Sequence, residues 1–392
     1  MSPRSVHLSR RTGWDLAGNR LAARLETLRA DGGALLDLTE ANPTRCGLDW
    51  PPDALASAVA GPGLARYDPD PRGGLPARRA ISEYLLGHGA SADPERIVLT
   101  ASTSEGYALL LKLLCDPGDE VLAPAPSYPL LDLLCDLEGV RLRRYPLRWD
   151  GTWHVDLPAL SAAVTERTRA VVVVSPSNPV GALLAPEELG ALQDLCSGRG
   201  LALLGDEVFL DTARVPVTSV ASAQRCLAFH LSGLSKVCGL PQLKAAWIVA
   251  AGPEQEVARA LARLEVVADT YLSVSGPAQL AIPELLAARE RFLAPLRLRL
   301  AGNRAALARA AVGAPFDVLE GGGGWAAVVR AGEALDEERL CLDLLEEGVV
   351  VQPGFFYDFE RPGFVVVSLL PEPDRFARGV AALAARLRAA AG

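Results

Sequence analysis

Short apolar runs alternate with amphipathic stretches through the middle of this chain. Residues 169–176 (RAVVVVSP) and 201–207 (LALLGDE) are continuous apolar segments that end in proline or in charged residues. Continuous runs of this length are typical of strands that are buried on both faces, as in a parallel sheet. Similar strands are predicted at residues 96–101, 120–124, 226–232 and 245–251.

Apolar residues at helical spacing separate these runs and end in glycine or charged residues. They predict helices at residues 15–31, 75–89, 103–115, 128–139, 186–200 and 253–269. Strands that alternate with helices in this way predict an α/β fold, in which a large domain contains a mostly parallel, doubly wound sheet.

The pattern changes near residue 253. Residues 283–311 predict one long, charged helix that bridges two domains, and short strands follow between residues 321 and 370. The four consecutive glycines at 321–324 predict a turn, or a place where the backbone passes close to another segment. A terminal helix is expected at 376–392. We therefore expect a large domain at 49–282 and a smaller α/β domain built from residues 1–48 together with 283–392.

Composition excludes several classes of protein. The 392 residues carry 39 basic and 47 acidic side chains, and this net charge of −8 argues against a nucleic-acid or anionic-membrane surface. The chain contains no apolar run of about 18 residues, and its N-terminus lacks a hydrophobic signal core. Seven scattered cysteines without a CxxC spacing, and four separate histidines, predict neither disulfides nor a metal site. A reducing cytoplasm is the expected location.

Polar residues follow several of the predicted strands, where ligands of open α/β sheets bind. Residues 101–106 (ASTSEG) open a helix after one strand, and Asn178, Asp206 and Lys236 follow three others. Individually these are ordinary helix starts, turns, caps or surface charges. Together they provide a phosphate cradle, an amide, a carboxylate and an amine. Pyridoxal phosphate requires this set, because it carries a phosphate, a phenolic oxygen, a ring nitrogen and an aldehyde.

The sequence resembles the class I/II aminotransferase family of fold-type I pyridoxal-phosphate enzymes over residues 35–385. Six segments carry the resemblance in family order and spacing: YDPDPRGGLPARRAISEYL, LTASTSEG, PAPSYP, SPSNPVG, GDEVF and SGLSKVCGLPQLKAAW. The resemblance implies that Lys236 binds the cofactor aldehyde as a Schiff base and then moves a proton between Cα and C4′. It also implies that Asp206 pairs with the ring nitrogen, Asn178 hydrogen-bonds the phenolic oxygen and Tyr128 stacks on the ring.

The resemblance also assigns the residues that contact the phosphate. Its ligands would be Ser102, Thr103 and Ser104, with help from Ser232 or Ser235. Tyr67 lies where family members send a tyrosine across a dimer interface to the neighbouring phosphate. The implied protein is a homodimer with shared active sites.

Two departures from the family pattern concern the cofactor. The phosphate-binding arginine usually stands eight residues after the Schiff-base lysine, and here that position is Lys244. Lysine keeps the charge but lacks the planar bidentate fork, so we expect looser cofactor retention. The stretch GDEVF has Phe209 where many members have a tyrosine, which removes one donor to the phenolic oxygen. The loss should raise the pKa of the Schiff base.

A third departure concerns the substrate. Family members hold the α-carboxylate with an arginine in a sequence like RLSF, and Val366 stands at that position in GFVVVSLL. Arg45 and Arg361 are the candidate replacements, although either is as easily a solvated surface arginine. Trp325 and the aromatic run 355–357 suggest a roomy pocket wall, while core packing is the ordinary alternative.

The leading hypothesis is an aminotransferase that exchanges an amino group between an L-amino acid and a 2-oxo acid by ping-pong half-reactions. The alternative is a lyase or decarboxylase on the same scaffold, because the cofactor permits these reactions and the carboxylate clamp is missing. A cofactor-sensing regulator is a third hypothesis. Such regulators usually carry a DNA-binding module ahead of this fold, and only about 35 residues precede the resemblance here.

Overall fold

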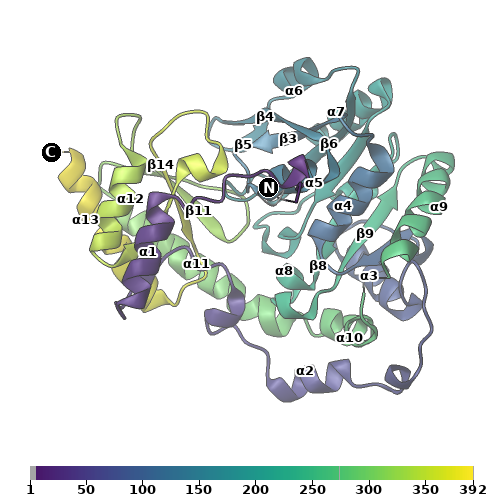
Figure 1. Cartoon of the computed structure of the whole chain (residues 1–392). Coiled ribbons are helices and arrows are strands. Elements are labelled where there is room, and N and C mark those ends of the chain that lie inside the picture. The colour runs from purple at the N-terminus through teal and green to yellow at the C-terminus, as the bar shows by residue number, and fades with distance from the viewer. Residues whose placement is uncertain (1–5, 273, 392) are drawn as a thin grey trace, which may run out of the picture.

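An eight-stranded sheet forms the centre of the larger lobe in the computed structural model, which describes residues 6–272 and 274–391 (Figure 1). In spatial order its strands are β2 (Ile97–Thr100), β9 (Ala246–Ala251), β8 (Ala228–Gly233), β7 (Ala202–Asp206), β6 (Thr168–Val174), β3 (Glu120–Ala125), β4 (Arg141–Trp149) and β5 (Trp153–Val155). The five central strands β8, β7, β6, β3 and β4 pair in parallel. The predicted α/β fold with a mostly parallel sheet is confirmed.

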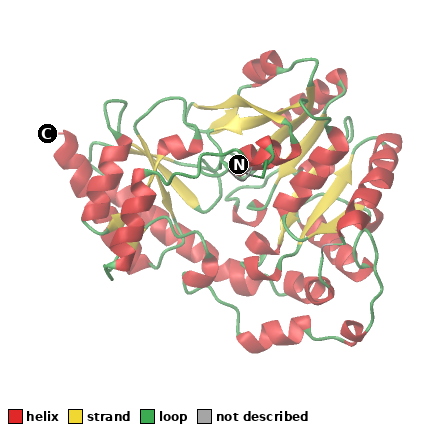
Figure 2. Ribbon diagram, in the orientation of Figure 1, coloured by secondary structure: helices red, strands yellow, loops and turns green. Residues whose placement is uncertain are grey.

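Helices cover both faces of this sheet (Figure 2). Their bounds are α3 (Leu75–Gly87), α4 (Thr103–Leu114), α5 (Leu130–Glu138), α6 (Leu157–Ala163), α7 (Pro186–Arg199), α8 (Leu234–Val237), α9 (Glu254–Tyr271) and α10 (Gly276–Ala287). The apolar residues of α4, α5 and α9 form one core with the sheet, and those of α6 and α7 form another on the opposite face. Burial on both faces explains why the strands are almost entirely apolar.

The smaller lobe contains a four-stranded antiparallel sheet. Its strands are β10 (Asp317–Leu319), β11 (Ala326–Arg330), β14 (Phe364–Ser368) and β13 (Gln352–Pro353). The lobe also contains α1 (Arg20–Ala30), α11 (Glu290–Ala311), α12 (Glu337–Glu346) and α13 (Pro373–Ala391), while α2 (Pro52–Val59) packs on α10. Two short strands, β1 (Leu36–Asp37) and β12 (Val349–Val350), pair in parallel and join the N-terminal segment to this lobe.

The structure corrects the sequence expectations in two places. The long helix expected at 283–311 is two helices, α10 and α11, with a break at Ala288 and Arg289. The elements β4, β5, α6 and α12 were not expected. For β4 (RLRRYPLRW) the reason is that it is too charged to resemble a buried strand. It lies near the sheet edge, where its arginines are exposed or partly buried. The domain boundaries stay a prediction, and the one at 282/283 falls inside α10.

Two further properties concern the cysteines and the apolarity of the helices. All seven cysteines are free thiols in the structure. None of the helices in the described part of the chain has the length and apolarity that a membrane span requires.

Candidate active site

Three residues singled out by sequence lie at one edge of the large sheet. Asp206 is the last residue of β7 and is paired with Leu231 of β8. Lys236 lies in the short helix α8, directly after β8, and Asn178 lies four residues after the end of β6. Because β6, β7 and β8 are parallel neighbours, their carboxyl ends place these side chains at the same edge.

The amine of Lys236 is enclosed by two aromatic rings. Its Nζ lies 4.6 Å from the ring centroid of Trp325 and 5.6 Å from that of Phe209. The two rings meet edge to face, with centroids 5.3 Å apart. Burial lowers the pKa of Lys236, and the Asp206 carboxylate partly opposes this effect. A lowered pKa makes the neutral, nucleophilic amine more abundant near neutral pH.

Asp206 is held from two sides. Its Oδ1 accepts a hydrogen bond from the Val208 amide at 3.3 Å, and its Oδ2 accepts one from the Tyr107 hydroxyl at 3.1 Å. Burial raises the pKa of Asp206 to about 6, while these two hydrogen bonds lower it. Sequence reasoning missed Tyr107, because only the helix register shows that a tyrosine in α4 reaches the end of β7.

Glu207, the next residue, has separate partners. Its carboxylate accepts hydrogen bonds from the Ser219 hydroxyl and the Val220 amide, and lies 2.7 Å from Nδ1 of His230. Glu207 and His230 are completely buried. This cluster ties β7 to β8 and to the segment after β7, so it supports the strand end that carries Asp206.

The predicted phosphate cradle is the N-terminus of α4. Ser102 is its N-cap, and the Ser102 Oγ accepts a hydrogen bond from the Glu105 amide at 3.1 Å. Thr103 and Ser104 form the first turn and are partly exposed. Helix N-termini of this kind favour anions. Ser235 is partly buried, whereas Ser232 is fully buried and its hydroxyl has no hydrogen-bond partner among the described residues.

The tetraglycine segment brings Trp325 to Lys236. The Gly322 amide donates to the Gly181 carbonyl at 2.7 Å, and the Arg214 amide donates to the Gly322 carbonyl at 2.9 Å. A Cβ on Gly321 would overlap the Val180 carbonyl oxygen. The glycines therefore allow two backbones to touch where the lobes meet, as the sequence suggested.

Arg304 also holds this segment and was missed by sequence reasoning. Its guanidinium donates to the Gly324 carbonyl at 2.9 Å, one residue before Trp325. Burial, followed by the nearby Arg214, lowers the pKa of Arg304 to about 10. Arg304 is partly buried, and its hydrogen bond holds the backbone next to Trp325.

Three predicted cofactor residues are exposed. Tyr128 is 51% exposed and borders Tyr357, whose carbonyl accepts a hydrogen bond from the Ser127 amide at 2.9 Å. Lys244 is exposed with left-handed backbone, at φ 51°. Tyr67 is 83% exposed and lines a groove away from Lys236 of its own chain.

The candidate carboxylate ligands have different surroundings. The side chain of Arg45 is 73% exposed and lies 3.8 Å from the Glu40 carboxylate. Arg361 pairs with Glu333 at 3.0 Å, beyond the end of β11 that is distant from Trp325. Val366 is buried in an apolar cluster with Trp153, Val180, Ala182, Leu319, Val328 and Tyr357. No residue of β14 is an arginine.

Sequence comparison agrees with this arrangement. The sequence model of the family "Aminotransferase class I and II" matches residues 35–382, which is most of the chain. The chain belongs to that family. The aminotransferase is 30% identical to the alanine aminotransferase of Mycobacterium tuberculosis, over 93% of its own length and 87% of that protein. It is 27% identical to the glutamate–pyruvate aminotransferase of Escherichia coli, over 92% of both chains.

A solved structure has the same architecture. An aminotransferase from Escherichia coli superposes on this aminotransferase with a TM-score of 0.87 and 25% identity, over 98% of both chains. Class I and II aminotransferases use pyridoxal phosphate. The residues present here fit that group: a desolvated lysine amine, a buried carboxylate, a helix N-terminus and an unpartnered serine hydroxyl occupy one sheet edge.

Proposed function

We propose that this aminotransferase binds pyridoxal 5′-phosphate through Lys236 and transfers an amino group between an L-amino acid and a 2-oxo acid in two half-reactions. The observation that carries the proposal is the lysine amine, enclosed by Trp325 and Phe209 and close enough to Asp206 for its pKa to be affected. When bound, the cofactor withdraws electrons from the substrate Cα through its ring. The protein then has to hold the ring and move one proton.

In this proposal each residue around the cofactor ring has its own function. Lys236 would hold the cofactor aldehyde and, as a neutral amine, would take up the Cα proton of the substrate. Asp206, ionised above a pKa of about 6, keeps the ring nitrogen protonated. Asn178 donates to the phenolic oxygen, and Tyr128 covers one face of the ring.

Within one subunit, the phosphate ligands in this proposal come from three places. Ser102, Thr103 and Ser104 supply the helix N-terminus, and Ser232 or Ser235 a hydroxyl. Lys244 supplies the cation opposite the phosphate.

The substrate is held without a cation on β14. Arg45 is the proposed ligand of its α-carboxylate, and Trp325 the wall of its side-chain pocket. Alanine, glutamate and their 2-oxo acids are the first substrates to test, because related proteins of Mycobacterium tuberculosis and Escherichia coli carry these activities in their names.

The small number of lysines makes the site of cofactor attachment easy to test. Only Lys112, Lys236 and Lys244 are lysines in this chain. Borohydride reduction of the purified protein, followed by peptide mass mapping, should find the pyridoxyl group on Lys236. Alanine or glutamate, added singly, should convert the visible absorption band to that of the pyridoxamine form.

Two results would contradict parts of this proposal. A pyridoxyl group on Lys112 or Lys244, or on none of the three lysines, would remove the assignment of Lys236. Release of ammonia or carbon dioxide, with the original band restored, would favour the lyase or decarboxylase alternative.

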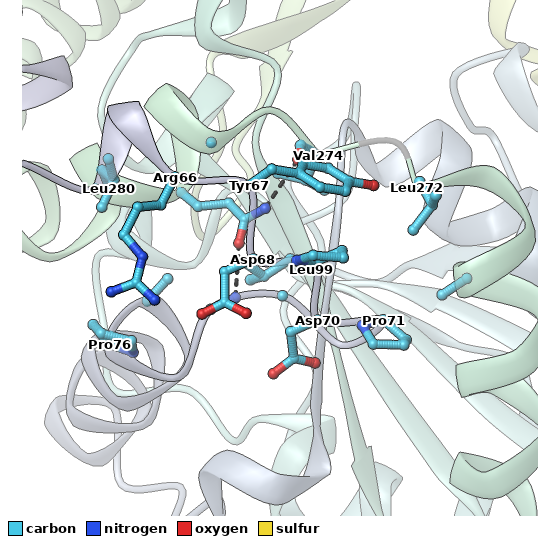
Figure 3. A pocket seen from close by; sticks show the side chains of 18 of the residues that line it. Arg66, Tyr67, Asp68, Asp70, Pro71, Pro76, Leu99, Leu272, Val274 and Leu280 are labelled. Carbon is cyan, nitrogen blue, oxygen red and sulfur yellow. Dashed lines mark hydrogen bonds between the residues drawn. The ribbon is translucent and has the colours of Figure 1, made fainter.

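We also propose a homodimer with shared active sites. Tyr67 lines a groove of about 430 Å³ together with Arg66, Leu272, Val274 and Leu280 (Figure 3). Several apolar side chains are exposed in the groove or next to its lining residues in the chain: Leu64, Tyr67, Tyr271, Leu272 and Leu280. An apolar patch of this kind marks an interaction surface, and Tyr67 of each subunit would reach the other subunit's phosphate. A cytoplasmic location stays a prediction.

A further inference from the structure

Helix α4 contacts the candidate site at two points. Its N-terminus, at Ser102 to Ser104, lies after β2 at the carboxyl edge of the sheet. Tyr107 lies on the same face as Thr103, four residues later, and its hydroxyl donates to Oδ2 of Asp206 at 3.1 Å. Tyr107 is 2% exposed. One rigid helix therefore connects the proposed phosphate cradle to the proposed partner of the ring nitrogen.

A close approach between α4 and the sheet makes this contact geometrically possible. Gly106 precedes Tyr107, and a Cβ at this position would lie 2.8 Å from Leu231 Cδ2 and 3.4 Å from Ile248 Cγ1. The absence of a side chain lets α4 lie directly on β8 and β9. At that depth the tyrosine hydroxyl reaches the carboxylate at the end of β7.

Several groups face Asp206. The Val208 amide donates to Oδ1 from the same chain segment. Lys236 and His230 supply nearby positive or ionisable groups, and Glu207 lies next to Asp206 in sequence and opposes its ionisation. Tyr107 is the side chain that donates a hydrogen bond to this carboxylate among the described residues. Its hydrogen bond therefore fixes the orientation of Oδ2. The nearby ionisable groups Lys236, His230 and Glu207 act on the carboxylate through charge and do not orient it in this way.

We propose that Tyr107 is a positioning residue, which fixes the Asp206 carboxylate at one end of the cofactor ring while the N-terminus of the same helix binds the phosphate at the other. This inference rests on the proposed function. The spacing between Thr103 and Tyr107 is about 6 Å along the helix axis at 1.5 Å per residue. Because a helix does not stretch, α4 sets the separation of the two anchoring points.

The Tyr107 hydroxyl affects how cofactor binding depends on pH. A hydrogen bond to the ionised carboxylate lowers the Asp206 pKa, so its loss raises that pKa. Cofactor affinity through Asp206 is fully present above this pKa and is lost as the pH falls through it. Without the Tyr107 hydroxyl, this loss begins at a higher pH.

The experiment compares Tyr107→Phe with Tyr145→Phe. Tyr145 is 1% exposed and donates to the Val172 carbonyl at 2.7 Å, so its variant also loses one buried hydroxyl, but away from Asp206. The probe is pyridoxine 5′-phosphate, an alcohol that binds without reacting with Lys236. Its dissociation constant is measured by fluorescence between pH 5.5 and 8.5, on full-length protein freed of cofactor.

We expect the midpoint of the affinity loss to move up by about one pH unit in Tyr107→Phe, because a hydrogen bond to a charged group is worth roughly one pKa unit. Binding should then be about fivefold weaker at pH 6 and almost unchanged at pH 8.5. In Tyr145→Phe the midpoint should not move. Thermal unfolding of both variants shows whether each one is folded.

Asp206→Asn separates the two possible failures. If this variant removes the pH dependence while Tyr107→Phe leaves the midpoint in place, the positioning function of Tyr107 is wrong and the proposed function stands. If Asp206→Asn changes neither the affinity nor its pH dependence, the assignment of Asp206 to the ring nitrogen fails, and the inference fails with it.

Discussion

At the scale of single residues, the most informative feature is where the chain uses lysine. Of its 39 basic residues, three are lysines, and two of these lie in the segment SGLSKVCGLPQLKAAW. The Schiff-base function proposed for Lys236 requires an amine that can lose its proton, which arginine cannot provide at physiological pH. The phosphate contact proposed for Lys244 has no such requirement, because an arginine could also supply that positive charge.

Replacement of Lys244 by arginine tests its function. Guanidinium binds phosphate through two parallel N–H groups, whereas ammonium binds as a point charge. We expect Lys244→Arg to lower the dissociation constant of pyridoxal 5′-phosphate several-fold, as measured by equilibrium dialysis. Lys112→Arg is the control, because Lys112 pairs with Glu138 at the C-terminal end of α4, away from the cradle. Weaker binding by Lys244→Arg would contradict the assignment.

Residue-level reasoning from sequence reached Lys236, Asp206, Asn178 and the helix start at Ser102, and their functions stay predictions. It reached them because each follows a recognisable strand. Tyr107 and Arg304 lie inside helices, surrounded by residues of similar pattern. No local signal separates an inward tyrosine that packs from one that donates to a carboxylate.

At the scale of elements, the segment Gly321–Gly324 fixes the position of β11 against the large lobe. Its backbone contacts the loop at Val180–Gly181 and the segment at Thr212–Arg214. These contacts hold Trp325 against Lys236. The four glycines are therefore a requirement of packing between two backbones.

Gly321→Ala should destabilise the protein by about 1–3 kcal/mol, because the new methyl group overlaps backbone atoms that cannot turn away. It should also change the near-ultraviolet circular dichroism of Trp325. Gly302→Ala, in the middle of α11 with open space around it, is the control and should stabilise by about 0.5–1 kcal/mol. Chemical denaturation measures both effects, and equal stability of the two variants would contradict the packing argument.

At the scale of the whole molecule, ion pairs and apolar packing join the two lobes. Arg144 of β4 pairs with Asp132 of α5 at 2.6 Å and with Asp358 of the small lobe at 3.0 Å. Trp153 and Val180 of the large lobe share an apolar cluster with Val366 of β14. The position expected to hold a carboxylate clamp therefore contributes to the junction of the lobes.

The groove at Tyr67 leads to a prediction about assembly. Leu280 is 39% exposed and lines the groove, so Leu280→Glu would place a charge in the proposed interface. We expect the dimer dissociation constant to rise at least about tenfold, a loss of about 1.4 kcal/mol, in sedimentation experiments. Leu298→Glu is the control, because Leu298 is 77% exposed on α11 and does not line the groove. Equal association of both variants would argue against this interface.

The sequence by itself determined the α/β fold, the family and the order of the polar residues after the strands. These properties follow from the local spacing of apolar residues and from the residues that end each strand or helix. They can therefore be predicted from neighbouring positions in the sequence. The tertiary structure alone decided that Trp325 meets Lys236, that Tyr107 reaches Asp206 and that Val366 joins the apolar cluster of Trp153. Each of these pairs joins residues about 90 to more than 200 positions apart, and only the packed chain brings them together.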